Sequence, residues 1–141
     1  MNAWIQIFTA LLGAYGFAMI YGVRPKYCLA AGIGGMLAWA VYLAANAWLG
    51  SMFLSCLAAA LFAMLYAELL ARWLRLPTTL FIVPAIIPLV PGSTLYYAMS
   101  EVVRGNIGKS KDYGYETLVV ALAIAAGLSF FIAIRELRTK K

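Results

Sequence analysis

Residues 78–99 read TTLFIVPAIIPLVPGSTLYYAM, an apolar run that is interrupted by Pro84, Pro88, Pro91 and Gly92. About 20 apolar residues are needed for a helix to cross a bilayer, so this run is long enough for one crossing. Each proline removes a backbone N–H donor and disfavours helical geometry in the residue before it. The sequence therefore predicts a transmembrane segment that is broken by Pro84, Pro88 and Pro91-Gly92 and is not one continuous helix.

The interrupted stretch begins about ten residues into the run, which at about 1.5 Å per residue places it near the bilayer midplane. Unpaired backbone at that depth is tolerated inside protein or beside a water-filled cavity. Ser93 or Thr94 is expected to cap a second half-helix, whose free N–H groups would suit a carboxylate. Many secondary transporters build substrate sites in this way. The alternative is a proline kink that neighbouring helices absorb.

The rest of the chain predicts an all-α integral membrane protein. It has 141 residues, of which 65% are hydrophobic and 11% charged, with a mean hydropathy of +0.90. Soluble domains are about 45–50% apolar and about 25% charged. The first run lacks a basic start and a cleavage site, so it reads as a mature helix rather than a signal peptide. We expect a single membrane domain, residues 1–141, with about five transmembrane helices at residues 3–23, 27–49, 52–71, 78–99 and 117–134.

The basic residues flank these runs unevenly, which accounts for the net charge of +6 without nucleic acid. Five crossings place eight of the 11 basic residues on one side: Arg24, Lys26, Arg72, Arg75, Arg135, Arg138, Lys140 and Lys141. The other side has Arg104, Lys109 and Lys111. The positive-inside rule then predicts an external N-terminus and a cytoplasmic C-terminus.

Small residues recur at helical spacing in four of the runs, which favours close approach of helices in lipid. They are Gly13 and Gly16, the pairs Ala30–Gly34 and Ala31–Gly35, the stripe Ala59, Ala63 and Ala67, and the stripe Ala121, Ala125 and Ser129. Two interpretations stay open: packing within the chain, and packing against another subunit of an oligomer.

Two glutamates are candidates for proton or ion coupling, because the chain has no histidine. Glu68 lies in an apolar run four residues before Arg72, so it either forms an ion pair with Arg72 or carries a proton. Glu101 shares a helical face with Ser93 and Tyr97, which suggests the mouth of a cavity. Asn46 is a secondary polar candidate.

Several classes of protein are excluded. Cys28 and Cys56 lie in apolar runs and form no CxxC pair, so neither a metal site nor a disulfide is expected. No nucleophile–base pair or phosphate-binding loop is present, so the chain is not expected to be an enzyme or to bind a cofactor.

The stretch from Pro88 to Met99, PLVPGSTLYYAM, resembles the threonine/serine exporter family. That family carries a similar I-P-x-x-P-G-x-x-x-Y-x-A-M stretch, which falls here on Pro88, Pro91, Gly92 and Tyr96. GFAMIYGV at residues 16–23 and the five-helix layout also resemble the family. The likeness is to the small type of subunit, which corresponds to the C-terminal half of the full-length exporter.

The resemblance implies export of threonine and serine driven by protons, or of dicarboxylates such as succinate, across the bacterial cytoplasmic (inner) membrane. It also implies a larger companion membrane subunit. We expect the backbone from Pro91 to Thr94 to bind a substrate carboxylate, with Tyr96 or Tyr97 closing the cavity. The competing hypothesis is a membrane assembly or scaffold protein that transports nothing.

Overall fold

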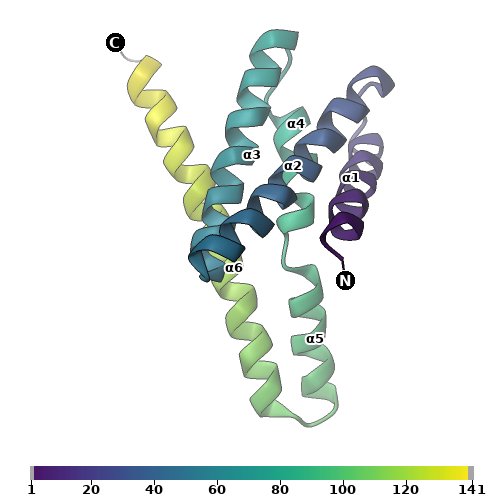
Figure 1. The fold of residues 1–141 in the computed structure, drawn as a ribbon, viewed down its shortest axis with the longest axis vertical. Coiled ribbons are helices and arrows are strands. Elements are labelled where there is room, and N and C mark those ends of the chain that lie inside the picture. The colour runs from purple at the N-terminus through teal and green to yellow at the C-terminus, as the bar shows by residue number, and fades with distance from the viewer. Residues whose placement is uncertain (1, 140–141) are drawn as a thin grey trace.

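The computed structural model describes residues 2–139, and those residues form helices and no strand (Figure 1). The elements are α1 (Ala3–Ile20), α2 (Pro25–Leu49), α3 (Met52–Leu74), α4 (Thr79–Ile86), the 3₁₀ turn η1 (Ile87–Leu89), α5 (Gly92–Val103) and α6 (Ile107–Thr139). Four of the helices are long and apolar enough to cross a membrane. Residues 79–89 and 92–103 form a pair bent by 47°, which makes a fifth candidate. The prediction of an all-α membrane fold with a broken fourth segment is confirmed.

Helix α4 occupies the middle of the bundle. It contacts α1, α2 and α3, while α2 packs between α1 and α3, and α3 packs on α6 (Figure 1). The Phe81 and Pro84 side chains of α4 are among the largest that are fully buried. The break that follows α4 is therefore held by three other helices.

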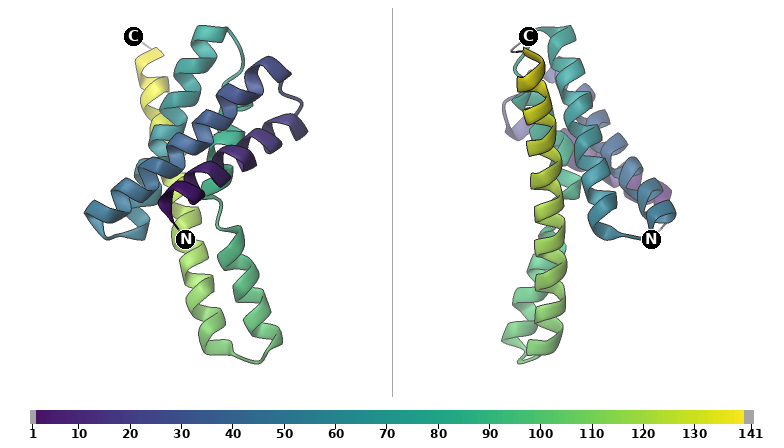
Figure 2. Two further views of the ribbon diagram at one scale, coloured as in Figure 1. Left: turned by 45° about the vertical axis from the view of Figure 1, so that its right-hand side comes forward. Right: turned by 90° about the vertical axis from the view of Figure 1, so that its left-hand side faces the viewer.

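Helices α5 and α6 form a hairpin that projects beyond the ends of α1, α2 and α3 (Figures 1 and 2). Gly105 makes the turn with a φ of +78°, a conformation that glycine adopts without steric cost. The Ser110 hydroxyl donates to the Ala98 carbonyl at 2.9 Å, which ties the two helices together. As a result α6 begins at Ile107, well before the predicted start of the last span at residue 117.

The small residues of α2 and α3 pack inside the bundle. A Cβ added to Gly34 would lie 2.7 Å from Cε1 of Tyr66, and one added to Gly35 would collide with Cβ of Ala14. The stripe on α3 is fully buried and comprises Ala59, Ala63 and Ala67. For these two helices the interpretation as internal packing is confirmed.

The small residues of α1 and α6 that the sequence singled out face outward instead. A Cβ on Gly13 or Gly16 would meet nothing within 4 Å. Helix α1 packs through other small residues, namely Ala10, Ala14 and Ala18. On α6 the members of the predicted stripe, Ala121, Ala125 and Ser129, are all exposed. Helix α6 buries Ala123, Ile124 and Gly127, so internal packing is wrong for these two stripes.

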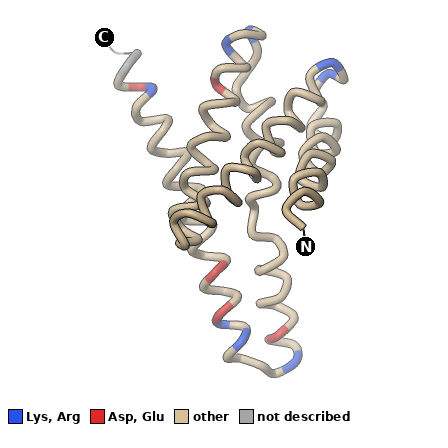
Figure 3. The backbone as a smooth tube through the Cα atoms, in the orientation of Figure 1, with Lys and Arg blue, Asp and Glu red and all other residues tan. Residues whose placement is uncertain are grey.

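Charged residues gather at the two ends of the molecule (Figure 3). The loop from α1 to α2, the loop from α3 to α4 and the end of α6 lie at one end, and the tip of the α5–α6 hairpin lies at the other (Figure 3). Lys140 and Lys141 of the predicted basic tail lie outside the described residues, as does the side chain of Arg138. The distribution of the described charges is the one that the sequence predicts, and the orientation in the membrane stays a prediction.

Candidate functional site

The break after η1 is a tight turn that the prolines impose. The Val90 N–H donates to the Ile87 carbonyl at 3.2 Å, and the Gly92 N–H donates to the Val90 carbonyl at 2.7 Å. Pro91, which lies between Val90 and Gly92, has φ −77° and ψ 52°, the conformation of an inverse γ-turn. The chain leaves this turn directly into α5.

Pro84 does not break the helix, contrary to the prediction that all three prolines do. It lies inside α4, which continues to Ile86. The missing N–H leaves one carbonyl of the preceding turn without its usual partner, and the helix tolerates this loss. The interruption is therefore confined to residues 87–91.

The break lies near one end of the bundle. It is lined by Met52 and Cys56, which belong to the first two turns of α3. The Thr78 hydroxyl, just before α4, bonds to Glu68 near the other end of α3 at 3.0 Å. The position of the break near the bilayer midplane stays a prediction.

A cavity of about 170 Å³ sits at the break. This is smaller than the roughly 300–1,000 Å³ of a drug-sized ligand pocket, so it suits a small metabolite. Its wall comes from α2, α3, the break, the start of α5 and α6. It comprises Trp39, Tyr42, Met52, Cys56, Pro88, Leu89, Val90, Pro91, Ser93, Thr94 and Val120. Four of the residues predicted for the site, Pro88, Pro91, Ser93 and Thr94, line it.

Two backbone donors lie beside this cavity, at the start of α5. The N–H groups of Ser93 and Thr94 make no backbone hydrogen bond among the described residues. The prediction that the Ser93 or Thr94 hydroxyl caps α5 is wrong, because the residue before α5 is Pro91. The Thr94 hydroxyl instead donates to the Pro91 carbonyl at 3.1 Å. The Thr117 hydroxyl of α6 lies 2.9 Å from that of Thr94. These contacts fix the start of α5 and leave the N–H groups of Ser93 and Thr94 without a backbone partner.

Trp39 separates this cavity from a second one of about 370 Å³. The second cavity is lined by Gln6, Thr9, Ala10, Trp39 and Pro88, so Trp39 and Pro88 contribute to both. The Trp39 indole N–H donates to the Gln6 side-chain carbonyl at 3.3 Å. Its ring also lies 4.9 Å, centroid to centroid, from that of Tyr42.

The remaining motif residues lie away from the cavity. Tyr96 and Tyr97 are 68% and 51% exposed, and Tyr97 stacks against Tyr113 of α6 at 5.6 Å. The predicted position of these tyrosines over the cavity is not the one observed. Gly92 does not line the cavity, and a Cβ added to it would meet nothing within 4 Å. Asn46 is exposed in the last turn of α2.

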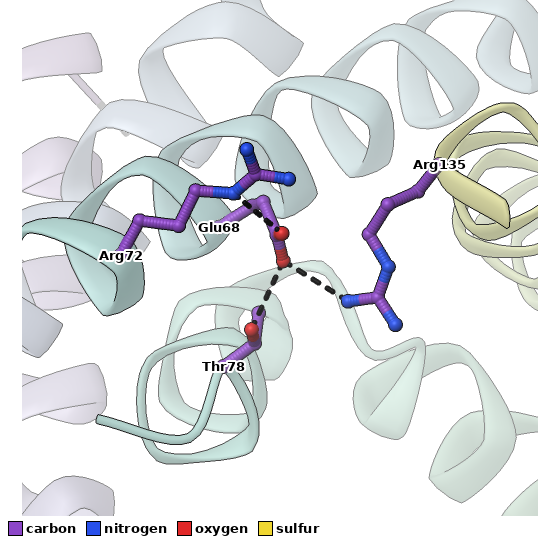
Figure 4. Close-up of polar contacts among 4 residues, drawn as sticks. All are labelled: Glu68, Arg72, Thr78 and Arg135. Carbon is purple, nitrogen blue, oxygen red and sulfur yellow. Dashed lines mark hydrogen bonds and ion pairs between the residues drawn. The ribbon is translucent and has the colours of Figure 1, made fainter. Parts of the chain in front are cut away.

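Glu68 lies at the opposite end of α3 from the cavity and has three partners (Figure 4). One carboxylate oxygen accepts from Nε of Arg72 at 2.9 Å. The other accepts from the Thr78 hydroxyl at 3.0 Å and from Nη1 of Arg135 at 3.1 Å. The ion pair with Arg72 is thereby confirmed, and the contact with Arg135 adds a link from α3 to α6.

Glu101 lies at the tip of the α5–α6 hairpin and not at the cavity. Its carboxylate accepts from Asn106 Nδ2 at 2.8 Å and from Arg104 Nη1 at 3.3 Å. The Asn106 N–H also donates to the Glu101 carbonyl at 2.9 Å. These bonds hold the turn between the two helices.

The cavity residues that the sequence did not identify as a site are Trp39, Tyr42, Met52, Cys56, Leu89, Val90 and Val120. Aromatic residues in an apolar run give no signal of their own, because lipid-facing and buried positions use the same side chains. The proline motif located the break, and only the packing of α2 and α3 reveals what faces it.

Comparison with known proteins gives one match. The family described as "Threonine/Serine exporter, ThrE" matches residues 6–134. No curated protein and no solved structure matches the chain. The matched range includes α2, α3, the break, α5 and most of α6, and so contains every residue that lines the cavity. The chain is a multi-pass membrane protein that belongs to the threonine/serine exporter family.

Proposed function

We propose that the chain is a subunit of a secondary transporter in the bacterial cytoplasmic membrane that exports small carboxylate-bearing metabolites of the threonine/serine type. The observation that carries this proposal is the 170 Å³ cavity at the break, beside two backbone N–H groups that lack backbone partners. Membership of the exporter family supports transport over the alternative of a scaffold protein.

The substrate carboxylate would accept hydrogen bonds from the N–H groups of Ser93 and Thr94. The start of a helix attracts anions through these groups and the helix dipole. The ammonium group of an amino acid would lie against the faces of Trp39 and Tyr42, since cations are attracted to aromatic faces. A dicarboxylate such as succinate has no ammonium group and would gain nothing from the second contact.

Transport would require a companion membrane subunit. Two outward stripes of small residues, on α1 and α6, support a contact with another chain, because small residues allow close helix packing in lipid. Glu68 and Glu101 are both held by several donors. If transport is coupled to protons, we infer that the companion subunit contributes a proton carrier.

The cavity is tested by filling it. We expect Ser93→Leu to reduce efflux of labelled threonine and serine at least about tenfold, since small changes of volume in an apolar pocket alter rates by about 10–200-fold. Gly92→Leu is the matched control, because it adds the same side chain one residue earlier, outside the cavity. Both variants are compared with wild type in cells that express both subunits at equal membrane levels.

The two hypotheses make opposite predictions in this assay. A transporter with this site loses flux in Ser93→Leu and keeps it in Gly92→Leu. Equal flux in both variants would rule out the cavity as the substrate site. Full flux from the companion alone, with this chain deleted, would favour the scaffold role.

A further inference from the structure

The outward face of α3 carries a groove that the proposed transport site does not use. It has a volume of about 510 Å³ and is lined by Tyr66, Leu69, Leu70, Arg72 and Trp73. It lies near the end of α3 that bears the Glu68 cluster, away from the break. The Tyr66 hydroxyl donates to the Ala30 carbonyl at 2.8 Å, so the polar atom of this side chain is already satisfied. Apart from Arg72, the residues that line the groove therefore present apolar surface.

Arg72 sits at the rim of the groove with part of its guanidinium free. Its Nε atom donates to Glu68, and neither of its two terminal nitrogens bonds to the residues shown in Figure 4. No hydrogen bond of these two nitrogens is found among the side chains that the structure describes. Arg135 also pairs with Glu68, so two arginines share this one carboxylate.

We propose that this groove binds one anionic phospholipid, with an acyl chain along Leu69 and Leu70 and the phosphate on the terminal nitrogens of Arg72. Planar guanidinium donors match phosphate oxygens in geometry and charge. Basic pockets at the ends of membrane helices bind anionic head groups by the same chemistry. Trp73 is 86% exposed one residue further on, where tryptophan marks the level of the head groups. A free anion would use the arginine and leave the apolar groove empty.

Native mass spectrometry of the full chain in a neutral detergent tests the proposal, with phosphatidylglycerol and phosphatidylcholine of identical acyl chains. We expect wild type to bind phosphatidylglycerol about fivefold more tightly than phosphatidylcholine, the difference expected from one arginine near an anionic head group. Arg72→Gln should abolish the preference and Arg72→Lys should retain most of it. Arg75→Gln is the matched control, because it removes the same charge from the same end of α3 but not from the groove. It should leave the preference unchanged.

Leu69→Gln provides a test that leaves the Arg72–Glu68 pair intact. It should weaken binding of both lipids, because it places a polar group in the apolar groove. Equal loss in Arg72→Gln and Arg75→Gln would overturn the proposal in favour of general electrostatic attraction. Displacement of phosphatidylglycerol by equimolar inorganic phosphate would overturn it in favour of a free-anion site.

Discussion

At the scale of single residues, the structure separates groups that stabilise the fold from groups that face the cavity. The Glu68 side chain is 10% exposed, and its carboxylate accepts from three donors on α3, the loop before α4, and α6. A buried carboxylate that loses its charge leaves those donors poorly satisfied. We therefore expect Glu68 to act as an anchor between helices.

Glu68→Gln should lower the free energy of unfolding by about 1–3 kcal/mol, the cost of leaving buried partners unsatisfied. Glu136→Gln is the control, because that glutamate is exposed on α6. Thermal unfolding in detergent, followed by size-exclusion chromatography, gives the comparison. A Glu68→Gln protein of unchanged stability whose efflux no longer depends on pH would instead identify Glu68 as a proton carrier.

Trp39 should govern the choice between amino acids and dicarboxylates. Trp39→Leu removes the aromatic face proposed for the ammonium group, so threonine efflux should fall about fivefold more than succinate efflux, in line with the strength of a cation–π contact. Gln6→Met is the control, because it removes the hydrogen bond to the Trp39 indole but keeps the ring. Equal losses for both substrates in Trp39→Leu would mean that the ring shapes the cavity without binding the ammonium group.

The sequence predicted part of the site at this scale. Pro88, Pro91, Ser93 and Thr94 were identified and line the cavity, because the motif that marks the break also forms its wall. Tyr96, Tyr97 and Glu101 were placed wrongly in space, because α5 packs against α6 and not back over α2 and α3. Which face of a helix meets a neighbour depends on contacts that are distant in the sequence.

At the scale of elements, the break is set by the position of each proline. Pro84 lies within a regular helix, whereas Pro88 and Pro91 bracket the turn. The sequence predicted the break itself because backbone chemistry is local. The extension of α6 back to Ile107 could not be predicted, since polar residues between 100 and 116 read as a loop until they pair with α5.

The double change Pro88→Ala and Pro91→Ala should straighten the segment, because it restores two N–H donors to the backbone. Spin labels at positions 79 and 103 should then move towards the about 36 Å of a continuous helix of that length. Pro84→Ala is the matched control and should leave the distance unchanged, since Pro84 lies inside α4. An unchanged distance in the double variant would show that tertiary packing, and not the prolines, imposes the 47° bend.

At the scale of the whole molecule, the charges at the two ends predict the orientation. In a cysteine-free background, Asn2→Cys and Gly108→Cys should react with an impermeant thiol reagent added outside the cell, and Pro77→Cys should not. Gly108 lies at the hairpin end and Pro77 in the loop at the opposite end, and both are exposed. The reverse labelling pattern would place the N-terminus in the cytoplasm.

The outward-facing small residues of α6 suggest how this chain assembles with another chain. Within lipid no hydrophobic effect drives helices together, so a stripe of small residues facing outward on a long helix favours close contact with a second helix. Ala121, Ala125 and Ser129 form such a stripe on α6 and are exposed in the single chain. The corresponding stripes on α2 and α3 are already used inside the bundle.

Ala125→Phe should therefore lower the amount of companion subunit that co-purifies with this chain. A phenylalanine would hold the two helices apart, and the loss of close packing costs about 1–3 kcal/mol, or roughly five- to a hundredfold in affinity. Ala44→Phe is the control, because it makes the same change at an exposed alanine of α2, away from the stripe on α6. Native mass spectrometry of the co-expressed pair would measure the assembled fraction, and threonine efflux should fall in proportion to it. Full assembly of Ala125→Phe would locate the contact elsewhere, and Gly13 and Gly16 of α1, where an added Cβ would meet nothing within 4 Å, would be the next surface to test.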